Sequence, residues 1–399
     1  MNPAPDRRHD LDWIRVCAFG LLVVYHVGMY YVSWDFHVKS PHAGTFAEPL
    51  MLLSSPWRLS LLFLVSGAAT AFMLGKGRAG FLRQRSWRLL LPLLFGMLVI
   101  VPPQSYYQVV EQLGYHDGYL AFWGRYLRAD HGFCRDGDCL TLPTWNHLWF
   151  VAYLWVYTAI LYAALRLAPA LMQGAGRRVA ARLAAGWGLL LWPAALLALA
   201  RITLADRFGS THALAGDWYN HAQYFPIFVL GYFVARETAV WERMRQLRRP
   251  ALLLALGSWA IIALWYALYL MDARAATLPP DTLLVPRRVL WGMNQWSAIV
   301  AICGYARQWA PGDSPALRYL VPAVFPIYIL HQTLIIIFAH NMQVWNLPPA
   351  IEAPLLIALT FAGCFAGYEL IRRVGWLRPL FGLKREMPGR VTRGAAVVA

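Results

Sequence analysis

Charged residues are scarce in this chain. Only 14% of its 399 residues are Asp, Glu, Lys or Arg, whereas 59% are hydrophobic, and the mean hydropathy is +0.44. Soluble domains carry about 25% charged residues, and a chain of this length would need a polar exterior in water. The shortage therefore excludes a soluble domain and indicates a protein whose outer solvent is lipid.

Other absences exclude further classes of protein. We see no internal repeat and no low-complexity segment, and we expect no soluble appendage and no cleavable signal peptide. Nothing resembles an element that reads a nucleic-acid groove, so we expect no nucleic-acid partner. Five histidines lie in or near predicted loops without metal-ligand spacing, so we expect no metal site. They are His37, His42, His116, His131 and His340.

Long apolar runs are what the chain does contain. Most hold about 17–25 residues, the length that crosses a hydrocarbon core about 30 Å thick. They predict an all-α, polytopic integral membrane protein with about ten transmembrane helices. We expect these near residues 12–32, 50–74, 87–103, 146–165, 183–203, 221–235, 250–271, 288–306, 319–340 and 353–371.

Basic residues set the expected orientation. With ten helices and a cytoplasmic N-terminus, 26 of the 36 Lys and Arg residues fall on the inner side. This bias follows the positive-inside rule, so both termini are predicted to be cytoplasmic, with residues 381–399 as a basic tail. The net charge of +16 then reflects topology and attraction to anionic lipid. The inner segments are 7–15, 76–88, 166–182, 236–249, 307–318 and 372–393.

Two polar residues in the first predicted helix share one face. His26 follows Arg15 by eleven residues, which places the two within about 20° around the helix and about 16 Å apart along it. Imidazole is the side chain best suited to general-base catalysis near neutral pH. A packing histidine with a hydrogen bond near the membrane interface explains the position equally well.

Arginines gather before the third predicted helix. Residues 76–88 carry Arg83, Arg85 and Arg88, and guanidinium groups at a helix start form a natural site for phosphates. The alternative is ordinary positive-inside charge.

Six stretches in order resemble the membrane acyltransferase-3 family, whose members O-acylate extracytoplasmic sugars and related acceptors. The resemblance spans almost the whole chain, and the opening segment looks most like the succinyltransferase of periplasmic glucans. The stretches are Leu11 to His26, Arg58 to Gly67, Arg83-Gln84-Arg85, His147-Leu148-Trp149-Phe150, Phe228 to Gly231 and Phe325 to His331.

The resemblance implies roles for particular residues. His26 would be the catalytic base, and Arg83 and Arg85 would anchor the phosphates or pantetheine of acyl-CoA, although Arg85 and Arg88 could also supply the pair. Arg15 would line the same path. For His331 a pore-lining role and a structural hydrogen bond both stay open.

The chemistry of acyl transfer also needs a group that stabilises the oxyanion, and the candidates are Arg58, Trp149 and Tyr328.

The longest predicted outer segment, residues 104–145, is expected to be either a lid that recognises the acceptor or a flexible spacer. It carries Cys134 and Cys139, which an oxidising compartment would join. The four residues between them include Gly137 and can form a turn that brings the two Cα atoms within about 7 Å. We therefore predict a disulfide; two free thiols or half of a metal site are the alternatives.

These observations predict an enzyme. A membrane acyltransferase domain at residues 1–380 would move an acetyl or succinyl group from cytoplasmic acyl-CoA to a hydroxyl of an extracytoplasmic glycan or glycolipid. Transfer would be direct, because no Cys or Ser stands in an obvious nucleophile-and-base arrangement. We expect no bound cofactor, with acyl-CoA as co-substrate, and a location in a bacterial inner membrane. A proton-coupled transporter or flippase is the alternative.

Overall fold

The protein is built almost entirely of helices. The computed structural model describes residues 8–75, 77, 79–135, 137–269 and 281–385. About 77% of these described residues are helical and very few of them lie in strands, and they contain seven helices that are long and apolar enough to cross a membrane. The prediction of an all-α polytopic membrane protein is confirmed. Predicted features outside the described residues are Arg7, Lys76, Arg78, the end of the 250–271 helix, and residues 386–399 of the tail with Arg390 and Arg393.

Each of the ten predicted helical ranges overlaps a long helix of the structure. That all ten cross the membrane, and that both termini are cytoplasmic, stay predictions. The seven candidate spans are α1 (His9–Tyr31), the continuous run of α4 (Phe81–Phe95), η1 (Gly96–Ile100) and α5 (Pro102–Leu113), the run of η2 (Asn146–Leu148) and α7 (Trp149–Leu167), α9 (Gly188–Phe208), α11 (Thr238–Tyr269), the run of α13 (Pro315–Met342) and η4 (Gln343–Trp345), and α14 (Pro349–Arg373). The other three helices are α3 (Arg58–Leu74), α10 (Trp218–Val234) and α12 (Leu284–Trp309).

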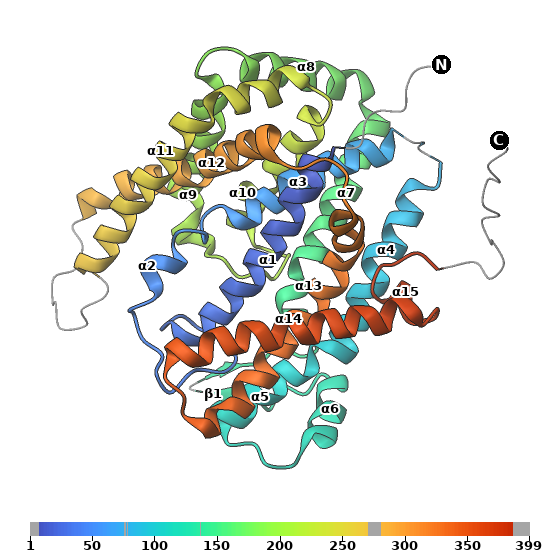
Figure 1. Cartoon of the computed structure of the whole chain (residues 1–399), viewed down its shortest axis with the longest axis vertical. Helices are drawn as coiled ribbons and strands as arrows, with labels where there is room; N and C mark the ends of the chain where they lie inside the picture. The colour runs from blue at the N-terminus through green and yellow to red at the C-terminus, as the bar shows by residue number, and fades with distance from the viewer. Residues whose placement is uncertain (1–7, 76, 78, 136, 270–280, 386–399) are drawn as a thin grey trace, which may run out of the picture.

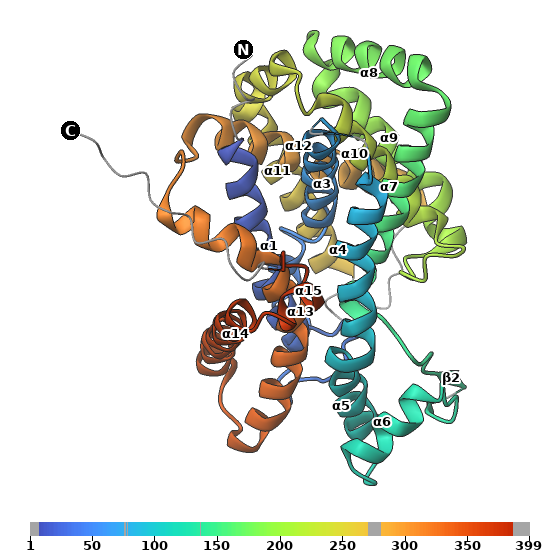
Figure 2. The same cartoon turned by 90° about the vertical axis from the view of Figure 1, so that its right-hand side faces the viewer.

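Some of the short elements lie at the two ends of the molecule. Helices α5 and α6 and the two-stranded sheet lie at the opposite end from α8, as Figures 1 and 2 show. Between these ends, α1 packs against α3 and α13, and α13 packs against α14 and α5. The short elements are α2 (Glu48–Met51), α6 (Tyr119–Leu127), α8 (Pro169–Ala184), η3 (Asp281–Leu283), α15 (Leu377–Leu380), β1 (Cys134–Arg135) and β2 (Asp138–Cys139).

Several predicted boundaries were wrong. The helix expected from residue 50 begins at Arg58, because Pro56 lacks an N–H and disfavours helical backbone in the residue before it. Helix α11 begins at Thr238 rather than 250, since its charged first turns are helical without being apolar. The segment 104–145 begins inside α5 and contains α6 and the β1–β2 hairpin, so it is not an open loop.

Helices α3 and α10 cross at two glycines. A Cβ atom added at Gly67 would lie 1.9 Å from the carbonyl oxygen of Phe228, and one at Gly231 would lie 2.0 Å from that of Leu64. Only glycine allows the two backbones to come this close, as in other tightly packed membrane helices. The crossing fixes α3, and therefore Arg58 at its first turn, against the rest of the bundle.

Much of the apolar surface faces outward. In the most apolar windows of α11 and α14, only 22% of the residues are buried inside the protein. Large exposed apolar side chains on α11 include Leu253, Ile261 and Leu264. Such a surface would be unfavourable in water and suits contact with lipid acyl chains.

Candidate active site

Two histidines that lie 305 residues apart in the chain are in contact. Nδ1 of His26, on α1, lies 2.9 Å from Nε2 of His331, on α13. The side chain of His331 is completely buried, whereas His26 lines a cavity. The packing of α1 against α13 thus joins two residues that the sequence suggested separately.

The hydrogen bonds of this pair determine which nitrogen of His26 is free. Nδ1 of His331 lies 2.6 Å from the main-chain oxygen of Tyr328; because a carbonyl oxygen only accepts, this nitrogen carries the proton. In neutral His331, Nε2 is then an acceptor, so Nδ1 of His26 donates to it. Nε2 of neutral His26 keeps its lone pair, and it makes no hydrogen bond within the part of the chain that the structure describes. A general base needs this form of imidazole.

His147 supports the pair from η2, the turn that leads into α7. Its Nε2 lies 3.1 Å from the carbonyl oxygen of Ile329 and donates to it, while its Nδ1 accepts from Nε2 of Gln104 at 3.3 Å. The hydroxyl of Tyr328 donates to the carbonyl oxygen of His147. Both ring nitrogens are therefore engaged, and His147 holds α7 against the segment of α13 that carries His331.

A cavity of about 420 Å³ opens beside His26, and we call it the histidine cavity. Arg58 lines it and is only 7% exposed, with its guanidinium carbon 3.2 Å from the ring centroid of Tyr25. Among the described residues, Nε and Nη1 of Arg58 have no hydrogen-bond partner. Buried donors of this kind are costly unless a ligand satisfies them. The polar lining of the cavity includes His26, Arg58, Asn146, His147, His212 and Gln332.

Sequence reasoning missed the wall formed by the loop before α10. His212 lines the histidine cavity and stacks on Trp149, with ring centroids 4.1 Å apart. Its backbone has a φ of 57°, a strained conformation for a residue other than glycine. No local sequence pattern marks such a position, because the stacking partner lies 63 residues away.

Asp217 holds this loop in place. Its carboxylate accepts from the hydroxyl of Tyr153, from Nδ2 of Asn220 at 2.8 Å and from the main-chain N–H of His212 at 3.0 Å. Burial alone would raise the pKa of Asp217, but these hydrogen bonds hold the pKa below its ordinary value. Burial lowers the pKa of His212, against the opposing charge of Asp217. The loop thus presents a neutral, fixed imidazole at physiological pH.

A second cavity, of about 460 Å³, collects positive charge, and we call it the arginine cavity. Apolar side chains such as Phe19, Met73 and Leu154 form much of its wall. None of the described residues that line it is Asp or Glu, so the site is electropositive and suits an anion attached to an apolar arm. Its basic residues are Arg15, Arg85, Arg88, Arg378 and Lys384.

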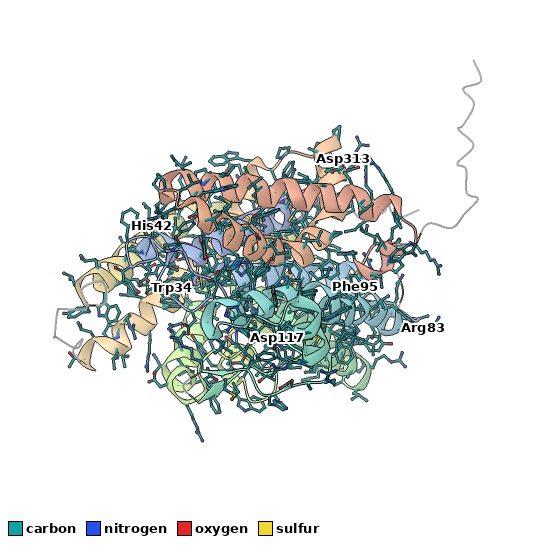
Figure 3. The ribbon with its side chains drawn as sticks, turned by 90° about the horizontal axis from the view of Figure 1, so that it is seen from below. Trp34, His42, Arg83, Phe95, Asp117 and Asp313 are labelled. Atoms are coloured by element: carbon teal, nitrogen blue, oxygen red, sulfur yellow. A yellow bond between two sulfur atoms is a disulfide. The ribbon has the colours of Figure 1, made fainter. Side chains whose placement is uncertain are left out.

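The structure does not bring Arg83 into this cavity. Arg83 is exposed and lies at the edge of the molecule in Figure 3. Residues two apart on an α-helix point about 200° apart, whereas residues three apart share a face. Arg85 and Arg88 are therefore the two arginines of this helix that line the cavity, which is the second of the two pairs that the sequence analysis left open.

The two cavities meet at two aromatic side chains. Phe150 and Tyr328 line both the histidine cavity and the arginine cavity. These two residues therefore form the wall between the electropositive cavity and the cavity that His26 lines. Arg15 and His26 lie on either side of this wall, one in each cavity.

The cysteine pair lies at the end of the molecule that carries α6. Cys134 and Cys139 face each other across β1 and β2, joined by a disulfide with Cα atoms 4.0 Å apart. Among the residues placed by the structure, no three His, Cys, Asp or Glu side chains are grouped so that they could hold a metal ion.

Comparison with known families decides the class of the protein. Residues 8–369 match the acyltransferase-3 family, described as an acyltransferase domain. The chain belongs to the acyltransferase-3 family. The match covers every residue that lines the histidine cavity and most of the arginine cavity. No curated protein and no solved structure matched the chain.

Membership confirms the predicted resemblance and the predicted enzyme class. This acyltransferase is a multi-pass membrane protein. The family match gives no support to the transporter or flippase alternative.

Proposed function

We propose that this acyltransferase moves an acetyl or succinyl group from cytoplasmic acyl-CoA to a hydroxyl of an extracytoplasmic glycan or glycolipid. One observation carries the proposal. His26, whose Nε2 makes no hydrogen bond among the described residues, lines a cavity that shares the wall of Phe150 and Tyr328 with an electropositive cavity.

The donor would bind in the arginine cavity. Arg15, Arg85 and Arg88 would pair with the phosphates of coenzyme A, because guanidinium groups form strong charge-assisted bonds to phosphate. The pantetheine arm would run along the apolar wall, and the thioester would pass between Phe150 and Tyr328. Such a path needs movement of these two rings.

The acceptor hydroxyl would enter the histidine cavity. Nε2 of His26 would remove its proton as the hydroxyl oxygen attacks the thioester carbon, forming a C–O bond. The C–S bond then breaks, and the proton on His26 passes to the departing thiolate of coenzyme A. His331 would act as a positioning residue, because its bond to Nδ1 fixes the His26 ring.

Charge that develops on the thioester oxygen needs a donor nearby. Arg58 is suited to this role, because its buried Nε and Nη1 have no partner among the described residues. A direct transfer agrees with the contacts of His26, which hydrogen-bonds only His331 within the described chain.

The cellular setting follows from the charge distribution. An inner-membrane location with both termini and the basic residues 381–399 in the cytoplasm would place the arginine cavity on the side that contains acyl-CoA. The histidine cavity would then face the periplasm.

Mass spectrometry of envelope glycans and glycolipids tests the proposal. Cells that lack the gene should lose one acyl group from a defined acceptor, and the wild-type gene should restore it. The His26→Ala gene is the matched control and should not restore it. Identical spectra with and without the gene would contradict the proposed function.

A further inference from the structure

A third cavity, of about 530 Å³, lies beneath the disulfide-linked hairpin, and we call it the hairpin cavity. Three segments enclose it: the loop after α1, the outer part of α5, and the β1–β2 hairpin. Its volume is within the range of small-molecule sites, about 300–1,000 Å³. The polar residues that line it are Asp35, His37, Gln108, Gln112, Arg135 and Asp138.

The hairpin cavity adjoins the histidine cavity. Phe36 lines both of them. A molecule whose reacting hydroxyl lies beside His26 therefore meets the hairpin cavity as soon as it extends past Phe36. The space open to the acceptor therefore continues from the histidine cavity into the hairpin cavity.

Several polar groups of the hairpin cavity are held in place before any ligand arrives. Nδ1 of His37 donates to Oε1 of Gln108 at 2.7 Å. Nε2 of Gln108 donates to Gln112 at 3.4 Å, and Gln112 donates to the main-chain oxygen of His37 at 3.4 Å. Each amide nitrogen keeps a second N–H for a ligand. This preorganisation lowers the entropy cost of binding.

Two carboxylates complete the set of hydrogen-bonding groups. Asp35 and Asp138 are exposed and accept no hydrogen bond from any residue that the structure describes. Carboxylate and amide groups together accept from and donate to neighbouring hydroxyl groups. The rings of Phe36 and Phe133 add apolar faces.

The charge of this cavity differs from that of the arginine cavity. The arginine cavity holds five basic residues and no described acidic one, whereas the hairpin cavity holds two carboxylates and one guanidinium. A phosphate or another anion is therefore disfavoured here. A neutral, hydroxyl-rich chain fits the available groups better.

We infer that the hairpin cavity is a binding subsite for the sugar units of the acceptor that neighbour the acylated unit, so that the acceptor is an oligosaccharide rather than a single sugar. This inference rests on the proposed function. The Cys134–Cys139 disulfide fixes the hairpin that carries Arg135 and Asp138 over the subsite.

Glycan binding to the purified full-length protein in nanodiscs tests the subsite. The probes are a microarray of bacterial envelope oligosaccharides graded from single sugars to long oligomers. The wild type should retain oligomers and not the matching single sugars. The Asp35→Asn/Asp138→Asn variant should lose about tenfold in affinity for them, as expected for lost charge-assisted hydrogen bonds.

Two controls keep the result interpretable. Asp117→Asn changes an exposed carboxylate near α6 that does not line the cavity (Figure 3) and should bind like the wild type. Reduction of the disulfide should weaken oligomer binding in the wild type.

Equal binding by the Asp35→Asn/Asp138→Asn and Asp117→Asn variants, or retention of no oligomer at all, would overturn the subsite. Failure of the proposed function is a separate result. In that case wild-type membranes transfer no radiolabelled acyl group from acetyl-CoA or succinyl-CoA to envelope glycans, whatever the array shows.

Discussion

Nδ1 of His26 on α1 lies 2.9 Å from Nε2 of His331 on α13, and the Nδ1 atom of His331 lies 2.6 Å from the Tyr328 carbonyl oxygen. Nδ1 of His26 donates to Nε2 of His331, and Nδ1 of His331 donates to the carbonyl oxygen of Tyr328. This arrangement leaves Nε2 of His26 as the basic atom of the site.

His331→Ala should therefore lower kcat while leaving the KM for acyl-CoA near the wild-type value, because it frees the His26 ring to rotate without touching the donor. We expect a loss of about tenfold to a hundredfold, below the 10²–10⁴ that a general base contributes. His331→Gln, whose side-chain oxygen can accept from Nδ1 of His26, should recover part of the rate. Steady-state kinetics check this, and equal losses in both variants would contradict the positioning role.

Arg85→Ala and Arg88→Ala should each weaken acyl-CoA binding about tenfold or more, because each removes a charge-assisted bond to phosphate. Arg83→Ala is the matched control, because Arg83 lies two residues from Arg85 but outside the cavity, and it should bind normally. Calorimetry with a non-hydrolysable acyl-CoA analogue measures the three affinities. If Arg83→Ala weakens acyl-CoA binding and Arg88→Ala does not, the phosphate-binding pair is Arg83 and Arg85, as the family's Arg-x-Arg pattern suggested.

Gly67→Leu and Gly231→Leu should destabilise the protein, because a Cβ at either position meets the backbone of the facing helix. Overpacking costs about 1–3 kcal/mol or more, which corresponds to a fall of several degrees in Tm. Gly257→Leu on α11 is the control, since nothing lies within 4 Å of the added Cβ. Thermal unfolding in nanodiscs decides; similar Tm values for all three would argue against the close crossing.

Cys134 and Cys139 should resist alkylation in intact membranes until a reductant is added, and should then react with a membrane-impermeant reagent from the periplasmic side. The reason is their disulfide in the hairpin and the predicted outer position of that hairpin. Peptide mass spectrometry locates the label. Alkylation before reduction would refute the disulfide, and labelling only by permeant reagents would refute the outer location.

The sequence predicted the helices of this fold well and their ends less well. Apolar length identified each long helix, but it could not find Arg58 as the start of α3 or Thr238 as the start of α11, because a helix boundary depends on backbone geometry and not on hydropathy. It also missed the helical parts of residues 104–145, since α5 and α6 there are amphipathic and short.

Only those relations of the candidate site that lie within a single helix could be predicted from the sequence. Arg15 and His26 share a face of α1, so their common direction followed from periodicity. The contact of His26 with His331, and the stacking of His212 on Trp149, join distant segments and need the tertiary packing. The sequence left the partner of Arg85 open between Arg83, which the family's Arg-x-Arg pattern suggested, and Arg88; the structure places Arg88 with Arg85 in the lining of the arginine cavity.

The rate of acyl transfer by purified His26→Ala protein tests the central claim most directly. Assays with labelled acetyl-CoA or succinyl-CoA and the acceptor found in the envelope should show kcat reduced by about 10²–10⁴, while Tm stays within about 5 °C of the wild type, as expected for a change worth less than about 2 kcal/mol. Turnover near the wild-type rate in a folded His26→Ala protein would contradict the assignment of His26 as the base.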